Sequence, residues 1–504
     1  MASRRDELNA YTFAKRRLVA QFLRPSPTGS EEGAPRPMRA VLPGLLVGAV
    51  VLAVFGAWGM FRPTAPRDWA KTRTNIIVAG GSTARYVVLE ADGVRKLHPV
   101  LNMASARLLI DVSQGGVVKV DDRILDEKGP PRGATLGIPY APDRLPEPDA
   151  AVAPKSWAVC ERPGRGGGGG VQRAVFVLSG KDRDALESPN RLRGDQILYV
   201  EGPGHVRYVV DAAGTAYRLG SDPALLTQVV GPGRVPQQVS DRWLATLPKA
   251  GPITSPLPGG KLAAPTPEPR VQAPLNRVGT VLVTGVAGNR HQHYLVLPDR
   301  IAPVTDLMAK LITNSANRTL RALHPGGRPH PASAGFAPGA PYLPPGGAKW
   351  PASTSGAVNS PSAAPGSRNT VCSLLGAVDP TTGRITLRTW AGTGFPKPLP
   401  TAADPVYVTA GSGQYFRQFK GAQPRTGTDY LLTDTGLRHA MQSNGDTARG
   451  TVRATGGAAE RPKSAAELLG YGEKRPAPVP AAWADLLPKG PRLSTGAAQQ
   501  PQGS

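Results

Sequence analysis

One uninterrupted apolar run stands out from the mixed pattern of the rest of the chain. The 21 residues from Val41 to Phe61 carry no charged side chain and form the only such run in the sequence. At a helical rise of about 1.5 Å per residue they reach roughly 30 Å, the thickness of the hydrocarbon core of a bilayer. A cleaved signal peptide is the competing interpretation, but its apolar region would be shorter and closer to the start of the chain. We therefore predict a membrane-spanning helix over residues 41–61.

A second helical pattern precedes this run, over residues 6–23. It places apolar side chains toward one side and basic side chains toward another, and Ser3 is a candidate cap. Such a helix docks on anionic lipid or on a partner protein, or it is a solvated stub that only carries the positive-inside signal. The side chains that we expect to dock in the cytoplasm are Tyr11, Phe13, Arg16, Arg17 and Phe22.

After the apolar run, one short pattern occurs four times, each time as a strand, a turn and a second strand. Each first strand combines an aromatic residue with β-branched residues or leucines, and an Asp/Gly-type turn follows, which is typical of a hairpin. The first strands lie at 85–88, 207–210, 293–296 and 429–432, and the second strands at 93–97, 214–218, 300–304 and 436–439. The sequence thus predicts four copies of one hairpin.

The residues that follow the hairpins alternate in type. Copies one and three continue into helical patterns at 99–110 and 304–312, whereas copies two and four end in the similar segments 242–249 and 482–489. Further strands are predicted at 175–178 and 196–200 in one half, and at 384–390 and 406–408 in the other. The simplest explanation is the duplication of a unit, with an approximate twofold relation between the halves.

Glycine and proline divide the chain, because 60 Gly and 54 Pro concentrate in a few segments. The segment 332–367 in particular has little to bury, and the tail after Ser494 is expected to be unstructured. The predicted domains are a cytoplasmic helix and linker (1–40), the membrane helix (41–61), a first repeat (62–153), the first half of a central β domain (154–200), a second repeat (201–254), a Pro-rich linker (255–275), a third repeat (276–331), a low-complexity linker (332–368), the second half of the central domain (369–428), a fourth repeat (429–495) and a disordered tail (496–504).

Charge and cysteines indicate which side of the membrane the bulk occupies. Eight basic residues precede the apolar run, which favours a cytoplasmic N-terminus, although positive charge also follows it. Cys160 and Cys372, the two cysteines of the chain, both lie after the run and are flanked by strand-forming residues. They form either a disulfide, as suits an oxidising exterior, or two buried thiols. We predict the disulfide.

The chain is strongly basic, with a formal net charge of +24. Such a balance suits nucleic acid, anionic lipid, acidic wall polymer or an acidic partner, and it also suits a merely solvated surface. The expected exterior location, the spread of the arginines and the lack of a zinc-finger, helix-turn-helix or aromatic-platform signature disfavour nucleic acid.

Candidate chemistry is sparse. The nearest match to a phosphate-binding loop, Gly259-Gly260-Lys261-Leu262, lacks the earlier glycine and the Ser or Thr after the lysine, and the glycine run at 166–170 has no following Lys. His291 and His293 share a strand face without an evident third metal ligand. The acidic pairs 121–122 and 182/184 lie in turn-like sequence. We predict no catalytic, cofactor or metal site.

Several motifs together resemble the EccB family, a membrane component of actinobacterial type VII (ESX) secretion systems. The resemblance covers nearly the whole chain and is carried by the start at residues 4–17, the single span, the run His98 to Leu108, the Trp157-x-x-Cys160 pair, residues 430–436 and residues 487–494. The positions we expect to be structurally important in these motifs are Tyr86, Pro99, Asn102, Ser105, Arg107, Trp157, Tyr430, Asp434, Gly436, Pro488, Gly490 and Pro491. The sequence departs from the family pattern at 332–367, after Cys160 and at 447–473, which leaves the boundaries there open.

The resemblance implies an α+β fold: a single N-terminal transmembrane helix, then an elongated extracytoplasmic region of four small hairpin-plus-helix repeat domains around a central β-rich domain with pseudo-twofold symmetry. It also implies a single-pass protein of the cell membrane that assembles with an FtsK/SpoIIIE-type ATPase, with EccD- and EccE-like subunits, and with further copies of itself. Some family members carry an ATPase attribution, which the residues of this chain do not support. Three functions are therefore weighed: an assembly subunit of a secretion complex, which we favour; a membrane-anchored protein that grips anionic wall polymer; and an ATP-hydrolysing accessory subunit.

Overall fold

A computed structural model describes residues 4–23, 38–60, 65–91, 93–111, 115–164, 170–187, 189–286, 290–332, 336, 339–344, 347, 349–399, 405–442 and 463–502 of the 504-residue chain. The chain divides into two compact units. One unit holds residues 1–69, 79–82 and 119–129, and the other holds residues 70–78, 83–118 and 130–504.

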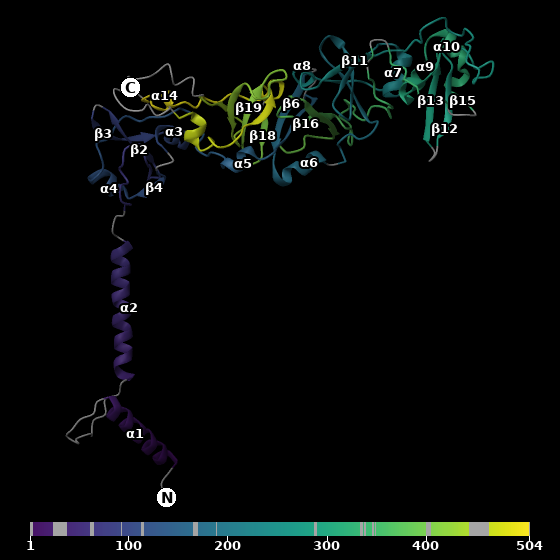
Figure 1. Ribbon diagram of the computed structural model, residues 1–504. Helices are drawn as coiled ribbons and strands as arrows, with labels where there is room; N and C mark the ends of the chain where they lie inside the picture. Colours follow the sequence, from purple (N-terminus) through teal and green to yellow (C-terminus); the bar gives the residue numbers. More distant parts are fainter. Residues whose placement is uncertain are drawn as a thin grey trace. The chain divides into compact units, whose positions relative to one another are not determined.

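Two long helices lie in the first unit, α1 (Arg4–Leu23) and α2 (Met38–Met60) (Figure 1). The part of α2 from Val41 to Trp58 has a mean hydropathy of 2.3, contains no buried residue, and is long and apolar enough to cross a membrane. Pro43 is the sixth residue of α2 and lies inside the helix. The helix predicted over residues 41–61 is therefore present as a candidate span.

Four small sheets share one core strand order, in which a three-stranded antiparallel meander receives a further strand beside its first strand, and the second sheet has a fifth strand beside the third strand of its meander. The first sheet is β3-β2-β1-β4, built from β1 (Ile76–Ala79), β2 (Arg85–Ala91), β3 (Val94–Val100) and β4 (Val117–Val120). The second sheet is β10-β7-β8-β9-β11, built from β7 (Ile197–Glu201), β8 (Arg207–Asp211), β9 (Ala216–Leu219), β10 (Gln237–Gln238) and β11 (Lys249–Ile253).

The third and fourth sheets repeat the order. The third sheet is β14-β13-β12-β15, built from β12 (Val281–Val286), β13 (Arg290–Val296), β14 (Ile301–Val304) and β15 (His330–Pro331). The fourth sheet is β21-β20-β19-β22, built from β19 (Gln414–Phe419), β20 (Thr428–Leu432), β21 (Arg438–Ala440) and β22 (Ala477–Pro480). Antiparallel pairs form at all four predicted hairpins.

A fifth, central sheet combines two distant parts of the chain. Its order is β17-β16-β5-β6-β18, with β5 (Ser156–Pro163), β6 (Val171–Leu178), β16 (Thr370–Val378), β17 (Ile385–Gly392) and β18 (Val406–Val408). Strands β5 and β16 are antiparallel neighbours in the middle, and each has its own hairpin partner on its outer side. Residues 160 and 372 face each other in this register, so the pairing is symmetric about them.

Short helices accompany the sheets. Asn, Thr, Asp or Ser side chains cap α3 (Met103–Leu109), α7 (Pro223–Val230), α9 (Asp306–Thr313), α10 (Arg318–Leu323) and α12 (Ala465–Leu469). The remaining short helices are α4 (Asp122–Glu127), α5 (Pro148–Val152), α6 (Asp184–Glu187), α8 (Asp241–Leu244), α13 (Ala481–Ala484), α14 (Thr495–Ala498), and the 3₁₀ turns η1 (Gly180–Arg183), η2 (Pro203–His205) and η3 (Pro325–Gly327).

The hydrophobic cores show which sheets are joined. One core contains residues of the first and fourth sheets together, among them Leu108, Leu431 and Leu469. Another joins the second sheet to α9 of the third sheet's segment, through Val229, Leu307 and Leu311. The largest core packs the central sheet against α8 and α13. The sheets are thus joined in two pairs, and a central sheet packs against one member of each pair.

Two segments differ from the sequence-based expectation in their pairing or type. The strand expected at 196–200 forms as β7, but it pairs with β8 and not with the central β domain. This pairing depends on tertiary contacts, which periodicity does not reveal. Copy two of the hairpin is also followed by a helix, α7, which was not predicted, although Asp222 caps it and Pro223 is its first residue.

The segment 332–367 and the tail differ as well. Of the segment, residues 349–359 lie along the second and third sheets, and Ala357 and Asn359 are buried. In the tail, α14 packs on α3 with Ala498 buried, and the backbone N–H of Gln502 donates to Thr135 O. Both segments are poor in large apolar side chains, so composition predicted disorder, but small side chains allow the close backbone approach that holds them. Most of the departure from the family pattern at 447–473 lies outside the described residues, because the structure does not describe residues 443–462.

Candidate functional site

The disulfide between Cys160 and Cys372 lies at the middle of the central sheet. The two residues are directly opposite each other on β5 and β16, and both side chains are fully buried. The predicted bond is therefore present, and the alternative of two separate thiols is not. It links positions 212 residues apart and ties the two halves of the central sheet covalently.

Buried polar side chains next to the disulfide hold the second sheet in place. Ser240 donates its backbone N–H and its Oγ to the carboxylate of Glu161, at 2.8 and 2.5 Å, and Glu161 is fully buried. The Gln237 amide donates to Asn369 O at 2.9 Å. Sequence reasoning missed these residues, because their role depends on partners roughly 80 to 130 positions away.

The run from His98 to Leu108 forms the end of β3 and the helix α3. The Asn102 Oδ1 caps α3, accepting from the Ser105 N–H at 3.0 Å and from its Oγ at 2.7 Å. Asn102 Nδ2 donates to Ile138 O at 2.8 Å, and the Ile138 N–H donates to Ser105 Oγ at 2.8 Å. This closed, buried network fixes the entry to α3 and the loop at 136–138.

Arg107 extends this element toward the fourth sheet. Its Nη1 donates to Leu469 O at 3.1 Å, at the C-terminal end of α12, where a cation also opposes the negative end of the helix dipole. The Tyr471 hydroxyl donates to Pro146 O at 2.6 Å across the same join. Lys463 pairs with Asp111, and Lys474 with Asp149. These bonds link segments more than 300 residues apart.

Pro488, Gly490 and Pro491 form a backbone cradle for a buried histidine. The Arg438 N–H donates to Pro488 O, the Gly490 N–H donates to Arg438 O, and the His439 Nδ1 lies 3.0 Å from Pro491 O. A Cβ on Gly490 would overlap the His439 ring, which explains the glycine. Burial lowers the pKa of His439, against a smaller opposing contribution from the bond to Pro491.

The first sheet has the same device. His98 Nδ1 lies 2.8 Å from Ala134 O, and a Cβ on Gly133 would overlap the His98 ring. The Leu136 N–H donates to the carbonyl of Pro99 at 2.9 Å, which fixes the returning segment against β3. Tyr86, on β2, packs its ring under the Arg132 guanidinium at 4.6 Å from the ring centroid.

Aromatic side chains connect the central and fourth sheets. Trp157 Nε1 donates to Gln414 Oε1 at 2.8 Å, and its ring meets Phe416 edge-on at 5.8 Å between centroids. Phe416 in turn stacks on Tyr430 at 5.5 Å, and the Arg438 guanidinium lies 5.0 Å from the Tyr430 centroid. These motif residues form a packing column.

Asp434 and Gly436 occupy the turn between β20 and β21. The Gly411 N–H donates to Asp434 Oδ2 at 3.0 Å. Gly436 has a φ of +82°, and a Cβ there would approach Val406 at 3.1 Å. A glycine suits this turn because it adopts a positive φ without strain and leaves room for β18.

Helix α1 exposes the side chains that we predicted to dock. Tyr11 is 69%, Phe13 64% and Phe22 90% exposed. At about 100° per residue, Tyr11 and Phe22 share one face, whereas Phe13 lies on the opposite side. Arg16 and Arg17 are exposed too. Lys15 falls on the face of Tyr11, so the basic side chains are less segregated than the sequence suggested.

The residues considered for phosphate or metal binding either bond to other residues of the fold or lie exposed in turns and strands. Gly259 and Gly260 lie in a bend followed by a turn, not by a helix whose N-terminus could bind phosphate. His293 Nδ1 lies 2.8 Å from Asp306 Oδ1, while His291 is exposed. No group of three or more potential metal ligands occurs among the described residues.

The acidic pairs also act locally. Asp122 accepts from the Gly81 N–H at 2.6 Å, and Asp121 caps α4. Asp182 accepts from Lys397, Tyr407 and Thr409, and its hydrogen bond with Lys397 is the main cause that lowers its pKa. These carboxylates hold loops to neighbouring elements.

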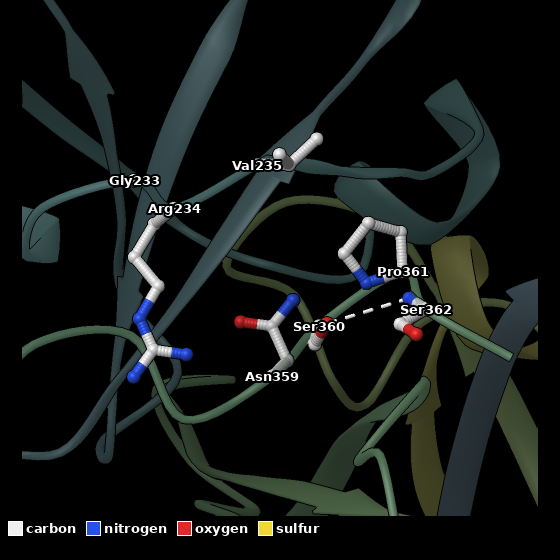
Figure 2. Close-up of a pocket in the computed structure, with 7 residues that line it drawn as sticks. All are labelled: Gly233, Arg234, Val235, Asn359, Ser360, Pro361 and Ser362. Carbon is white, nitrogen blue, oxygen red and sulfur yellow. Dashed lines mark hydrogen bonds between the residues drawn. The ribbon is translucent and has the colours of Figure 1, made fainter. Parts of the chain in front are cut away.

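A pocket of about 310 Å³ lies beside the second sheet (Figure 2). It is lined by Gly233, Arg234, Val235, Asn359, Ser360, Pro361 and Ser362. Asn359 is already engaged: its Oδ1 accepts from the Tyr199 N–H at 2.8 Å, and its Nδ2 donates to Tyr199 O at 3.0 Å. Arg234 is the one charged side chain in the lining, so the pocket offers no paired acid and base.

Comparison with known families gives a match over almost the full chain. The sequence model described as "Type VII secretion system ESX-1, transport TM domain B" matches residues 1–503. Among curated relatives, the ESX-3 secretion system ATPase EccB3 of Mycobacterium tuberculosis is 26% identical, with 97% of this chain and 88% of the relative covered. The protein of the same name from Mycolicibacterium smegmatis is 30% identical over 55% of this chain and 52% of its own.

Solved structures show the same fold. A chain of an intact ESX-5 inner membrane complex matches with a TM-score of 0.58 and 22% identity, covering all of this chain and 96% of its own. The EccB3 dimer from the ESX-3 core complex matches with a TM-score of 0.54 and 22% identity, covering 84% of this chain and 99% of its own.

Proposed function

The chain belongs to the EccB family and is a membrane-complex subunit of type VII secretion, and on that premise we propose that it works as an assembly scaffold whose exterior repeats supply protein–protein contacts for export across the envelope. The observation that carries this proposal is the contrast between its parts. The exterior sheets are bonded to one another across hundreds of residues, while α1 leaves Tyr11 and Phe22 exposed on one face. Large exposed apolar side chains on one face mark an interaction site.

The arrangement in the membrane follows from the same features. Residues 1–40 lie in the cytoplasm, α2 crosses the membrane once, and the bulk of the chain lies outside. The basic residues before the span and the buried disulfide after it support this orientation. Helix α1 then meets the partners on the cytoplasmic side, which are an FtsK/SpoIIIE-type ATPase and EccD- and EccE-like subunits. A second copy of the chain joins the same assembly, as the EccB3 dimer of a relative suggests.

Duplication explains the exterior architecture. The four small sheets are copies of one unit, at 62–153, 201–254, 276–331 and 429–495, around a central domain made from two halves. Their common strand order and the symmetric register about the disulfide support this origin. The halves of the central domain are related by an approximate twofold axis through the bond between Cys160 and Cys372.

Docking by α1 is tested on the full-length protein, purified in mild detergent from its host. The double variant Tyr11→Ser/Phe22→Ser removes the aromatic side chains of one face, and Phe13→Ser removes the opposite one. We expect the double variant to lose the co-isolated ATPase and multi-span subunits and Phe13→Ser to keep most of them, with both variants still in the membrane. Thr12→Ala, whose hydroxyl bonds only to backbone carbonyls of its own helix, is the matched control. Equal co-isolation in all four proteins would refute docking by this face.

Relatives of this chain are named as ATPases, so ATP hydrolysis is the main alternative to a scaffold role. We propose that this chain is not an enzyme, because its nearest glycine-lysine loop is not followed by a helix. ATP turnover by the purified full chain should equal that of a mock purification. Turnover above that blank which Lys261→Ala abolishes would establish the enzymatic alternative instead.

A further inference from the structure

The third sheet and its helices carry more unbalanced positive charge than the other repeats. Residues 276–331 hold seven Lys or Arg against two Asp or Glu, a formal net charge of +5. The corresponding value is +1 for residues 201–254 and +2 each for residues 62–153 and 429–495, although two of these segments are longer. The excess charge is therefore local to one repeat and is not spread evenly over the exterior.

The excess is concentrated around α10. Arg318 and Arg321 lie three positions apart on α10, which makes them neighbours on one helix face, and Arg328 follows the turn η3. All three are exposed, and none forms an ion pair within the described part of the chain. We call these three residues the arginine cluster (α10 in Figure 1).

The nearby carboxylates do not neutralise this cluster. Asp306 is occupied by His293 at 2.8 Å. Asp299, the other acidic residue of the repeat, lies in the turn between β13 and β14 rather than on α10. The other described basic side chains of the repeat bond to backbone: Arg277 to Ala263 O, Arg300 to Ala340 O and Lys310 to Thr354 O. The cluster thus holds three guanidinium groups with free donors.

The surroundings of the cluster indicate what kind of partner it fits. A protein partner is usually anchored by buried aromatic or apolar side chains, yet no large apolar side chain among the described residues of the third repeat itself (276–331) is strongly exposed. The nearest exposed ones, Leu257 and Leu343, lie in the flanking segments. A second copy of this chain also fits poorly, because all four repeats are net positive. Single-stranded nucleic acid would need exposed aromatic rings for stacking. A charge-only surface is instead suited to a flexible polyanion.

We propose that the arginine cluster of the third repeat binds an anionic polymer of the cell envelope, through its carboxylate or phosphate groups. Guanidinium groups bind both oxyanions with paired N–H donors, and a polymer offers many such groups at once. The contact rests on the exterior location assigned under the proposed function. It attaches the scaffold to the wall at a place separate from α1, where the membrane partners dock.

The test uses the full-length protein in detergent and insoluble cell-wall sacculi from its host. Sedimentation with the sacculi is measured at increasing NaCl concentration for the wild type, for Arg318→Gln/Arg321→Gln/Arg328→Gln, and for the control Arg218→Gln/Arg234→Gln/Arg242→Gln. The control removes the same charge from exposed positions of the second repeat. We expect the cluster variant to bind about tenfold more weakly and with a shallower salt dependence, and the control to change less than about threefold.

Soluble poly-glutamate and polyphosphate, added as competitors, distinguish carboxylate from phosphate recognition. Equal weakening in both triple variants would show that general surface charge binds the wall, and it would overturn the proposal. So would wild-type protein that fails to sediment, or a cluster variant that keeps sacculus binding and loses an acidic protein subunit. Co-isolation of the membrane subunits, measured on the same variants, reports separately on the proposed function and should stay unchanged. Matching melting temperatures establish that the variants fold.

Discussion

The two pairs of small sheets are built on the same strand order but are joined in different ways. Between the first and fourth sheets, α3 packs against α12 and α14, and side-chain bonds such as Arg107 to Leu469 O cross the join. Between the second and third sheets, α7 and α9 pack together, and the irregular segment 349–359 bonds to both. The Leu307 N–H donates to Ala352 O, and the Ala357 N–H donates to Val230 O. Helices take part in both joins, and the join between the second and third sheets adds an irregular segment held by backbone hydrogen bonds, which leaves little pattern in the sequence.

The disulfide ties together the two halves of the central sheet, and each half of the chain contributes one small sheet to each pair, so its loss should have the largest effect. Cys160→Ser/Cys372→Ser removes a bond closing a loop of 212 residues, and we expect a loss of about 2–5 kcal/mol in the free energy of unfolding. Thermal unfolding of the full chain, with and without reductant, measures it. The variant should be insensitive to reductant. A wild type that melts at the same temperature in both conditions, with the bond shown to be reduced, would contradict the role assigned to it.

The same substitution, asparagine to aspartate, can be made at two buried amides, one in the first repeat and one in the segment 349–359. Asn359→Asp replaces a donor to Tyr199 O by a carboxylate in a buried site, which should cost about 2–4 kcal/mol. Asn102→Asp loses the donor to Ile138 O in the same way, but its charge is at the N-terminus of α3, where it is tolerated better. We expect Asn359→Asp to lower the melting temperature more. The reverse order would show that the Asn359 amide contributes less to stability than the Asn102 amide.

In the backbone cradle around His439, position 490 is expected to tolerate no side chain. Gly490→Ala places a methyl group against the buried His439 ring and should cost about 1–3 kcal/mol. Gly496→Ala is the control, since a Cβ there meets nothing within 4 Å and α14 gains helix propensity. Urea unfolding of the two variants measures the difference. Similar midpoints would mean that the ring moves aside freely.

Trp243 and Trp483, one buried tryptophan from each half of the chain, can be compared for the contribution of the indole hydrogen bond. Trp243 Nε1 donates to Val159 O at 3.0 Å, whereas Trp483 Nε1 has no acceptor among the described residues. Trp243→Phe leaves a buried carbonyl without its donor and should cost about 1 kcal/mol more than Trp483→Phe, which removes the same volume. Melting temperatures of the two variants test this. Equal losses would indicate that the hydrogen bond contributes nothing.

Of the changes considered, lowering the pH should reduce the stability of the fourth sheet least. Burial is the main cause that lowers the pKa of His439 from its ordinary value of 6.5, with the bond to Pro491 opposing it. The unfolded chain therefore binds the proton first, so the stability present above about pH 6.5 is lost as the pH falls below it. His324, in the third repeat, contributes with the same sign, mainly through burial. His439→Gln should flatten part of the melting-temperature profile between pH 7.5 and 5. A profile as steep as that of the wild type would contradict this assignment.

The sequence predicted what depends on local pattern. The membrane helix, the four hairpins, α3 and α9 follow from periodicity, and the disulfide follows from two cysteines in strand-forming surroundings. It did not predict what depends on distant partners. Strand β7 was assigned to the wrong sheet, and residues 349–359 and α14 were taken for disordered chain, because their backbone contacts involve small or polar residues.

The same limit applied to the candidate site. Asn102, Arg107 and Gly490 were identified through the family motifs, but Glu161, Ser240 and Asn359 belong to no motif that was considered. Their hydrogen bonds join segments that are distant in the sequence, so these bonds can be recognised only in the folded structure. On α1, the docking residues stay a prediction from the sequence, and the helical geometry places Phe13 on the side opposite to Tyr11 and Phe22.

The scaffold role is tested most directly by deleting the gene for this chain in its host and sizing the remaining membrane subunits after mild solubilisation. We predict that the high-mass secretion complex disappears, that it returns with the wild-type chain, and that it does not return with the Tyr11→Ser/Phe22→Ser variant. A complex of full size that contains the ATPase and the multi-span subunits in the absence of this chain would contradict the account.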